Sequence, residues 1–375
     1  MARGDRRYAV DAERRNREAA QLGAPIMPVH AGPYLPQPPP AALLVTPLVP
    51  FGLPAASLIW LGISVLCAAW LAWSVAQIIG VTSVARTAGL FVLLLVWPPV
   101  LHNLEKGQWS ILLAALMAAG WRDLSAPRQR PHRAGVWFGL AASLKVVPAL
   151  MLPLLAMRHR PAARALLITA ACAGVATLPA VGLTGWSLFV AGSAPNVRAL
   201  ESWLANTASL HGLFARLFVG HPFARPLFSA PALGHALSAG AAVILLAIAG
   251  ITTTRARRDD GADESLFALW ASLAVLLNPL AWTHSLILLV VPLTLLAKSA
   301  AQAGRVGLLA GLGVALALIS IPKETLYRAA GDLPVSPGGT LWLSLHAAGA
   351  LMIFASAARA ARKAGPATKS APGLA

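Results

Sequence analysis

Apolar runs of about 16–25 residues, separated by short basic loops, divide most of this chain. Each run is long enough to cross the hydrocarbon core of a bilayer as a helix. Hydrophobic residues make up 57% of the 375 residues and charged residues only 11%, whereas a soluble domain carries roughly 25% charge. A soluble bundle of buried helices is the alternative, and the low charge disfavours it. The sequence therefore predicts an all-α polytopic membrane protein.

The expected membrane segments follow these apolar runs. One further segment, 134–157, is too long for one plain helix and has Lys145 and Pro148 near its centre. We expect it to form a pair of short helices that enters and leaves on the same side of the membrane. With this pair, we expect about 10–11 membrane helices. The other segments lie near 54–79, 85–101, 109–121, 164–185, 236–251, 264–278, 282–297, 305–321 and 340–358.

Basic residues are concentrated in one set of alternate loops. Cytoplasmic loops carry an excess of lysine and arginine, so we place this set inside the cell and the other set, which carries the polar clusters, on the external face of the inner (plasma) membrane. The net charge of +17 is spread over these loops and forms no single stripe, which argues against a nucleic-acid partner. The basic loops are 80–86, 122–133, 158–164, 252–263 and 298–305 with the tail 359–375; the other set is 102–108, 186–235, Asn278–Trp282 and 322–339.

The N-terminal segment departs from this alternation. The pattern places residues 1–53 outside, although the first 17 residues contain six arginines. Either the segment stays in the cytoplasm, or a first membrane helix is missing, and motif order favours the second. We expect residues 1–53 to form an external amphipathic helix and a proline-rich segment. Residues 54–358 would form the transmembrane bundle with the external loop 186–235, and 359–375 a disordered cytoplasmic tail.

One short polar stretch, residues 102–109, lies between two strongly apolar runs. Polar groups at the edge of a bilayer are costly and persist mainly where they are used, so this stretch is a candidate site. Lys106 offers a cation, and Asn103 and Gln108 offer hydrogen bonds to hydroxyl groups. The alternative is a polar hairpin tip with a Glu105–Lys106 surface pair, which contributes little to stability.

Six motifs follow one another along the chain. They are Asp5–Tyr8, Pro38–Leu48 with Trp60, Asn103–Gln108, Ser143–Pro148, Asn206–Gly212 and Asn278–His284. Their order resembles glycosyltransferase family 87, polyprenyl-phosphate-mannose-dependent transferases of the GT-C membrane fold. The resemblance implies a GT-C-like helical bundle. It also implies inverting transfer of a hexose, with mannose expected, from a polyprenyl-phosphate donor to a glycolipid or glycan acceptor. In that family a membrane helix precedes the aspartate, whereas Asp5 lies almost at the start here.

The resemblance also implies roles for individual residues. Asp5 is the expected general base that takes the proton of the acceptor hydroxyl, with Asp11 as a rival and a solvated surface acid as the alternative. Lys145, Lys106 and His284 are expected to hold the phosphate, where negative charge develops. Snorkelling to the interface would also explain Lys145, and a polar helix cap would also explain His284.

Further residues are expected to line the donor and acceptor sites. Asn103 and Gln108 would bind the donor, and Asn206, Ser209 and His211 would shape the acceptor pocket. Helix capping explains Asn206 and Ser209 equally well.

No metal or cofactor is expected. The histidines are scattered without ligand spacing, and no glycine-rich phosphate loop or dinucleotide motif is present. The partners would be the lipid bilayer, the lipid-linked donor and the acceptor. Two rival functions are a lipid or small-molecule transporter (flippase), since broken segments with embedded charge are also transporter features, and a catalytically inactive truncated relative. Repeated halves, which transporters tend to show, are not visible in the sequence.

Overall fold

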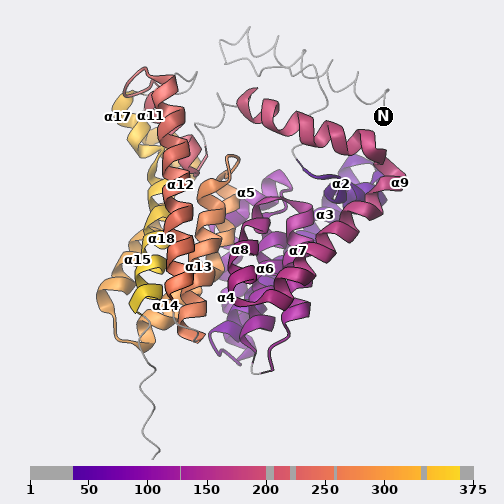
Figure 1. The fold of residues 1–375 in the computed structure, drawn as a ribbon, viewed down its shortest axis with the longest axis horizontal. Coiled ribbons are helices and arrows are strands. Elements are labelled where there is room, and N and C mark those ends of the chain that lie inside the picture. Colours follow the sequence, from indigo (N-terminus) through magenta and orange to yellow (C-terminus); the bar gives the residue numbers. More distant parts are fainter. Residues whose placement is uncertain are drawn as a thin grey trace, which may run out of the picture.

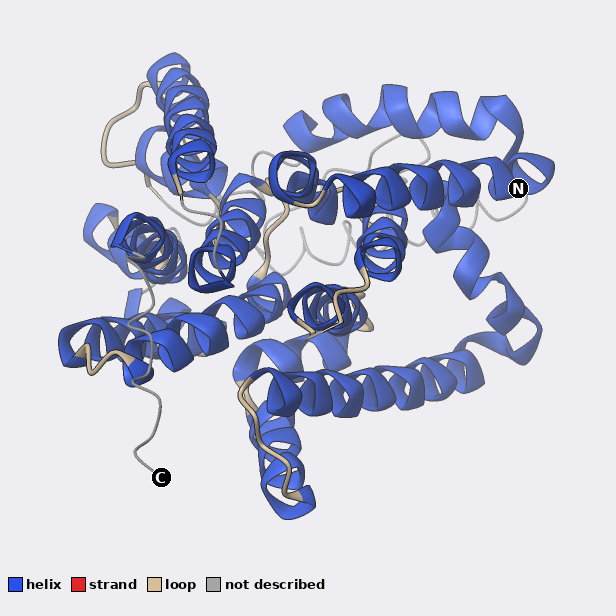
Figure 2. Ribbon diagram, turned by 60° about the horizontal axis from the view of Figure 1, so that its bottom comes forward, coloured by secondary structure: helices blue, strands red, loops and turns tan. Residues whose placement is uncertain are grey.

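The structure is a computed structural model that describes residues 37–126, 128–199, 207–219, 225–256, 260–330 and 336–363. Most of the described residues lie in helices and none of them lies in a strand (Figure 2). The helices of the N-terminal part lie on one side of the bundle and those of the C-terminal part on the other (Figure 1). The chain is an all-α polytopic membrane protein, as the apolar runs predict.

The N-terminal part is built from short and long helices joined by tight breaks. Its elements are α2 (Pro39–Val45), η1 (Thr46–Phe51), α3 (Gly52–Ile78), α4 (Val84–Val96), α5 (Pro98–Lys106), α6 (Ser110–Ser125), α7 (Pro131–Leu144), η2 (Val147–Met151), α8 (Leu152–Arg158) and α9 (Arg160–Ala199). The C-terminal part contains α11 (Leu210–Phe218), α12 (Pro231–Arg255), α13 (Asp260–Leu277), η3 (Thr283–Leu289), α14 (Val290–Gln302), α15 (Val306–Ser320), α16 (Lys323–Ala330), α17 (Pro337–Trp342) and α18 (Leu345–Lys363).

Fewer full-length spans are present than the sequence led us to expect. Among the described residues, four helical segments are long and apolar enough to cross a membrane, or six if each of two bent pairs is one span. Several other expected segments are helices that are too short, because a crossing needs about 20 residues and α6, for example, has 16. The four are Pro39–Ile78, Arg160–Ala191, Pro231–Arg255 and Thr283–Gln302.

Two expected boundaries fall inside helices. The long loop expected at 186–235 contains the end of α9, all of α11 and the start of α12, and α9 itself breaks at Gly182, whose φ is 61°. At the other end, α18 continues to Lys363, past the expected start of the tail at residue 359.

The pair of short helices expected at 134–157 is present as a hairpin, which the packing of α7, η2, α8 and α9 defines, and we call it the re-entrant pair after the expected topology. Gly135 of α7 lies against Ala162 of α9, and one turn later Gly139 lies against Leu166, so α7 and α9 run parallel. The chain must therefore return through η2 and α8 to the level at which α7 began. The 14 residues of α7 span about 21 Å, which places the break at Lys145 deep in the bundle.

Two bent helix pairs meet at their bends. The α4–α5 pair bends by 66° at Trp97, where Pro98 and Pro99 open the second helix, and the α15–α16 pair bends by 81°. The indole N–H of Trp97 donates to the hydroxyl of Ser320, the last residue of α15, at 2.7 Å. This bond fixes α5 and α16 at the same end of the bundle.

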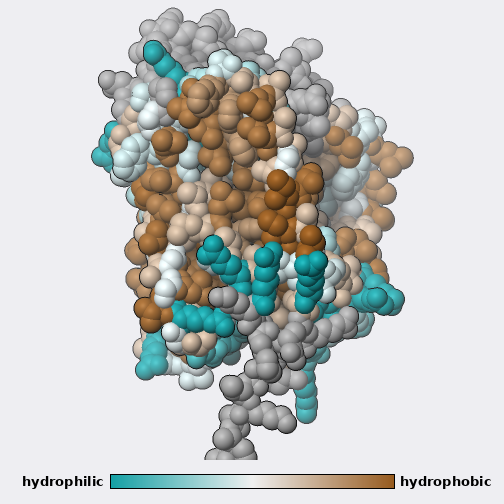
Figure 3. Space-filling view, turned by 60° about the vertical axis from the view of Figure 1, so that its left-hand side comes forward, coloured by the Kyte–Doolittle hydropathy of each residue, from teal (hydrophilic) through white to brown (hydrophobic). Residues whose placement is uncertain are grey.

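The core lies between the two parts of the chain. Helix α13 is almost wholly buried, and its Phe267 contacts Trp121 of α6 and Phe138 of α7, with ring centroids 4.8 and 6.2 Å apart. The outer surface is also apolar: leucine, valine and isoleucine side chains cover much of the face seen in Figure 3. Hydrophobic side chains over so large an exposed surface fit a protein that lipid surrounds.

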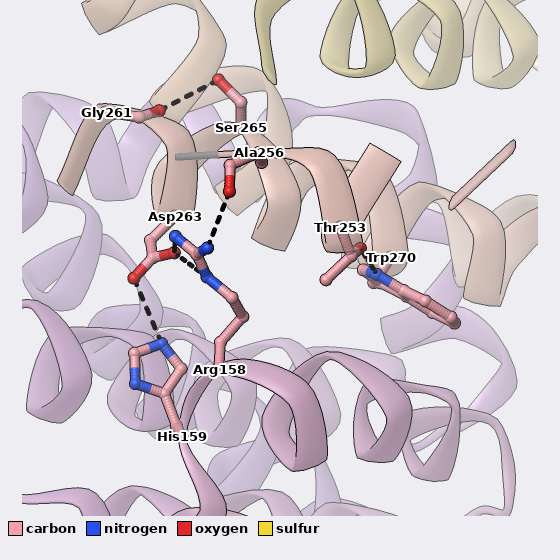
Figure 4. Close-up of polar contacts among 8 residues, drawn as sticks. All are labelled: Arg158, His159, Thr253, Ala256, Gly261, Asp263, Ser265 and Trp270. Atoms are coloured by element: carbon pink, nitrogen blue, oxygen red, sulfur yellow. Dashed lines mark hydrogen bonds and ion pairs between the residues drawn. The ribbon is translucent and has the colours of Figure 1, made fainter. Parts of the chain in front are cut away.

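A partly buried ion network joins the base of the re-entrant pair to the C-terminal part (Figure 4). Arg158 at the end of α8 reaches Asp263 of α13 through Nε at 2.8 Å and Nη2 at 2.6 Å, and it also donates to the carbonyl of Ala256 at 3.2 Å. His159 lies 3.4 Å from the second carboxylate oxygen of Asp263. Burial by itself raises the pKa of Asp263, but the hydrogen bonds from His159 and Arg158 outweigh it and hold the pKa below its usual value.

Candidate functional site

The polar stretch at 102–109 forms the end of α5 and a tight turn into α6. Gly107 ends α5 in the left-handed conformation, with φ at 60°, which a side chain would strain. The indole of Trp60 donates to the Gly107 carbonyl at 3.0 Å, and Trp109 meets the Trp60 ring edge-on with centroids 4.6 Å apart. These contacts hold the turn in place, and the two indole rings pack beside it.

Asn103 is fully buried within this turn. Its Oδ1 accepts from the backbone N–H of Ser110 at 3.0 Å and so satisfies a free N–H at the start of α6. Its Nδ2 has no hydrogen-bond partner among the described residues. A buried donor left unpaired costs about 1–3 kcal/mol, and such groups in native structures call for an explanation, such as a ligand.

His284 is the central side chain of the site. It is the second residue of η3 and is only 1% exposed. Its Nδ1 has no hydrogen-bond partner among the described residues. Its ring stacks with that of His102 of α5 at 5.8 Å and 19° between planes, and Trp282 meets it edge-on at 5.8 Å. The two histidines therefore join α5 to η3, although they are 182 positions apart.

Lys145 approaches the same histidine from the tip of the re-entrant pair. It follows α7 directly with an extended backbone, φ −153° and ψ 131°, because Pro148 prevents α7 from continuing. Its ammonium group makes no hydrogen bond or ion pair with another described residue, yet it lies close enough to His284 to act on its charge. A lysine in this position has its positive charge available to a ligand.

Lys323 is a fourth member of the cluster. It begins α16, is half-buried, and acts electrostatically on both His102 and His284. Its ammonium lies 5.7 Å from the ring centre of Tyr327, and its charge also interacts with that of Lys106. The cluster, which we call the cationic pocket, consists of His102, Lys145, His284 and Lys323.

The other residues expected at the donor site lie at its rim. Lys106 is about half exposed and pairs with Glu105 at 2.6 Å, the surface pair that was the alternative interpretation. Gln108 is partly buried, and its side chain makes no hydrogen bond to another described residue. Because their charges interact, Lys106 and Lys323 belong to one electrostatic neighbourhood.

The expected acceptor residues are only partly within the described chain. Ser209 is buried and caps α11, with its hydroxyl accepting from the Gly212 N–H at 3.0 Å, so the structure places it as a helix cap. The N–H of Ala208 donates to the carbonyl of Ala281 at 2.7 Å, which holds this cap against the junction that leads to η3. Asn206, Asp5 and Asp11 lie outside the described residues.

A buried arginine supports this cap from behind. Arg216 of α11 is 1% exposed and donates to the carbonyl of Thr207 at 2.8 Å and to the hydroxyl of Ser344 at 3.1 Å. Burial lowers the pKa of Arg216 to about 10, with the nearby Tyr327 opposing the shift, so the side chain stays charged at neutral pH. It joins α11, α16 and the start of α18.

Sequence reasoning missed three members of this region: Lys323, His102 as a partner of His284, and Arg216. Lys323 directly follows Pro322 at the end of an apolar run, a signal for a helix break that could have marked it. The stacking of the two histidines has no signal in the sequence. Among the described residues, no group of three or more histidine, cysteine, aspartate or glutamate side chains is placed to hold a metal ion.

Comparison with known proteins identifies the family. The family model of glycosyltransferase family 87 matches residues 35–279, a region that contains Asn103 and Lys145 and ends shortly before His284. A polyprenol-phosphate-mannose-dependent alpha-(1-2)-phosphatidylinositol mannoside mannosyltransferase from Mycolicibacterium smegmatis (strain ATCC 700084 / mc(2)155) is 30% identical over 196 residues. The aligned region is 50% of this chain and 41% of that relative. No solved structure matches the chain. The chain belongs to glycosyltransferase family 87.

Proposed function

We propose that this chain transfers a hexose, with mannose as the expected sugar, from a polyprenyl-phosphate donor to a glycolipid or glycan acceptor. The family supports a glycosyl transfer, and the name of the mycobacterial relative supports a polyprenol-phosphate-mannose donor. The reaction would take place on the external face of the plasma membrane, where the expected topology puts α5 and η3. A lipid-linked donor reaches that face without a nucleotide sugar crossing the bilayer.

The observation that carries the proposal is the cationic pocket. Transfer breaks the bond between the anomeric carbon and the phosphate oxygen, so negative charge grows on the leaving phosphate. Lys145 and Lys323 supply positive charge there, and the unpaired Nδ1 of the buried His284 can donate a hydrogen bond if it carries the proton. Groups held in place by the fold stabilise such charge at no cost of reorganisation during the reaction.

The acceptor must lose a proton as it attacks. Inverting transfer forms the new bond on the face of the sugar opposite the phosphate, in one step, while a carboxylate takes the hydroxyl proton. We assign that carboxylate to Asp5. Lys106, Asn103 and Gln108 would bind the donor at the rim of the pocket, and Asn206 and Ser209 would shape the acceptor side.

The transporter alternative predicts a different arrangement. A transporter collects its polar groups near the middle of the membrane with access to both sides. Here α5, η3 and α16 bring theirs to one end of the bundle, and Lys145 reaches them from the tip of the re-entrant pair. This arrangement favours an enzyme that works at one membrane surface.

The test is transfer of labelled mannose from polyprenyl-phosphate-mannose in membranes that contain the chain. We expect Lys145→Met to lower the rate at least tenfold, because it removes a positive charge from the pocket while keeping much of the side-chain length. Lys363→Met, at the far end of α18, is the matched control and should keep the wild-type rate. Asp5→Asn should abolish transfer, and full activity of that variant would disprove the assignment of the base. No transfer from any lipid-linked sugar by the wild type would reject the proposed function.

A further inference from the structure

A cavity of about 420 Å³ opens between α15 and α18, away from the cationic pocket. Its size lies within the roughly 300–1,000 Å³ typical of pockets for small molecules. One wall is the first turns of α15, and the other is the second half of α18. The lining residues are Arg305, Gly307, Leu308, Gly311, Met352, Ala355, Ser356, Arg359 and Ala360.

Glycines show that α15 and α18 separate toward this cavity. A Cβ atom added to Gly349 of α18 would meet Ile319 Cγ2 at 2.7 Å and the Ala315 carbonyl oxygen at 3.0 Å, so the helices touch closely there. A Cβ atom added to Gly307 or Gly311 would meet nothing within 4 Å. The first glycine permits tight packing, whereas the other two border open space that the protein does not fill.

Two arginines lie at the polar end of this space. Arg305 immediately precedes α15, and Arg359 lies in the last two turns of α18. Neither guanidinium makes a hydrogen bond or ion pair with another described residue. Each offers several N–H donors in a planar fork that matches a phosphate group. Ser356, three residues before Arg359 on α18, adds a hydroxyl to the lining.

The cavity lies where an apolar surface gives way to a hydrophilic one. The face in Figure 3 is apolar over most of its height, and a row of hydrophilic side chains lies below the apolar region. The α14–α15 loop and the end of α18 both lie at that lower end of the bundle in Figure 1. A lipid headgroup occupies this level of a membrane, with its acyl chains beside the apolar region.

We propose that this cavity binds an anionic glycerophospholipid. Its phosphate group would lie between Arg305 and Arg359, and an acyl chain would follow the groove along Leu308 and Met352. The charge complementarity favours an anionic headgroup over a zwitterionic one, since each nearby arginine or lysine attracts anionic lipid by about 1 kcal/mol. Gly307 and Gly311 leave this part of the groove free of side chains.

The test uses the full chain purified in detergent and titrated with phosphatidylglycerol or with phosphatidylethanolamine of the same acyl chains, with bound lipid counted by native mass spectrometry. We expect wild type to prefer phosphatidylglycerol about tenfold, which corresponds to two contacts of ~1 kcal/mol each with some loss to screening. The double variant Arg305→Gln/Arg359→Gln should lose this preference. The matched control, Arg128→Gln/Arg255→Gln, removes two exposed arginines elsewhere and should keep it.

A second variant tests the contribution of the groove's open space while keeping the charges of both arginines. A Cβ atom at Gly311 would meet nothing within 4 Å, and leucine favours a helix more than glycine does. Gly311→Leu should therefore fold normally, place its side chain in the open space and bind phosphatidylglycerol at least fivefold more weakly. Wild-type binding by Gly311→Leu would overturn the proposal, as would equal binding of the two lipids by wild type. Displacement of phosphatidylglycerol by equimolar inorganic phosphate would also overturn it, because the site would then bind a free anion.

Discussion

Removal of the Asp263 carboxylate tests whether the ion network in Figure 4 holds the re-entrant pair to the C-terminal part. Asp263→Asn leaves the guanidinium of Arg158, with its side chain 5% exposed, facing a neutral amide. Breaking a buried pair in this way costs about 3–5 kcal/mol, because the remaining charge is still desolvated. Bonds of 2.6 and 2.8 Å from one guanidinium to one carboxylate place this pair in the strong class.

The assay is thermal unfolding of the purified protein in detergent. For a chain of 375 residues the expected loss corresponds to a fall in Tm on the order of 5 °C at neutral pH. Glu264→Gln is the matched control, since it removes the neighbouring carboxylate, whose partner Lys298 has a side chain 27% exposed and can turn toward water. We expect the control to lose clearly less stability than Asp263→Asn.

The pH dependence gives the sharper check. Because the folded-state pKa of Asp263 lies below its unfolded value, its stabilising effect is complete above the unfolded pKa and is lost as the pH falls through the folded pKa. The gap in Tm between wild type and Asp263→Asn should therefore be constant at neutral pH and shrink as the pH falls below about 4. A gap in Tm of under about 1 °C at neutral pH, or one that stays the same in acid, would refute the reasoning.

Three other predictions concern the candidate site. Gly107→Ala should lower the free energy of unfolding by about 1–2 kcal/mol, because alanine is strained at a φ of 60°. Unfolding in denaturant measures this free energy. An unchanged value would mean that the turn has another conformation. Ser209→Ala should lower the free energy of unfolding by about 1 kcal/mol, because it removes the α11 cap. If the variant also raises the KM for the acceptor at saturating donor, Ser209 has a role in acceptor binding as well. An unchanged KM would mean that Ser209 is a helix cap alone. Lys106→Cys, in a Cys172→Ser background, should react with a membrane-impermeant maleimide in intact cells, and labelling only after lysis would reverse the proposed orientation.

The sequence predicts the helical class and the broken helix at Lys145, because both depend on local patterns. Long apolar runs require helices in a bilayer, and a lysine three residues before a proline marks a break. The sequence did not reveal the helices within 186–235. A gap between long apolar runs suggests a loop, although short helices such as α11 can form there and pack against the bundle.

The cationic pocket was only half predictable. Lys145 and His284 were found as motif residues, but their meeting with His102 and Lys323 depends on two bends and on the contact between Trp97 and Ser320. Residues 223 positions apart carry that contact, and neither one has a distinctive local pattern. The packing of distant segments determines which side chains meet in such a pocket. The periodicity of apolar residues within one segment carries no information about that packing.

The bond between the two helix bends has a mechanical consequence. Trp97 joins the bend of α4–α5 to the bend of α15–α16, so the two bends cannot separate without breaking a 2.7 Å hydrogen bond. His102 lies on the short helix that begins at the first bend, and Lys323 begins the short helix that follows the second. The distance between the starting points of these two helices is therefore fixed by one bond between segments far apart in the chain, and loss of that bond would let His102 and Lys323 move apart.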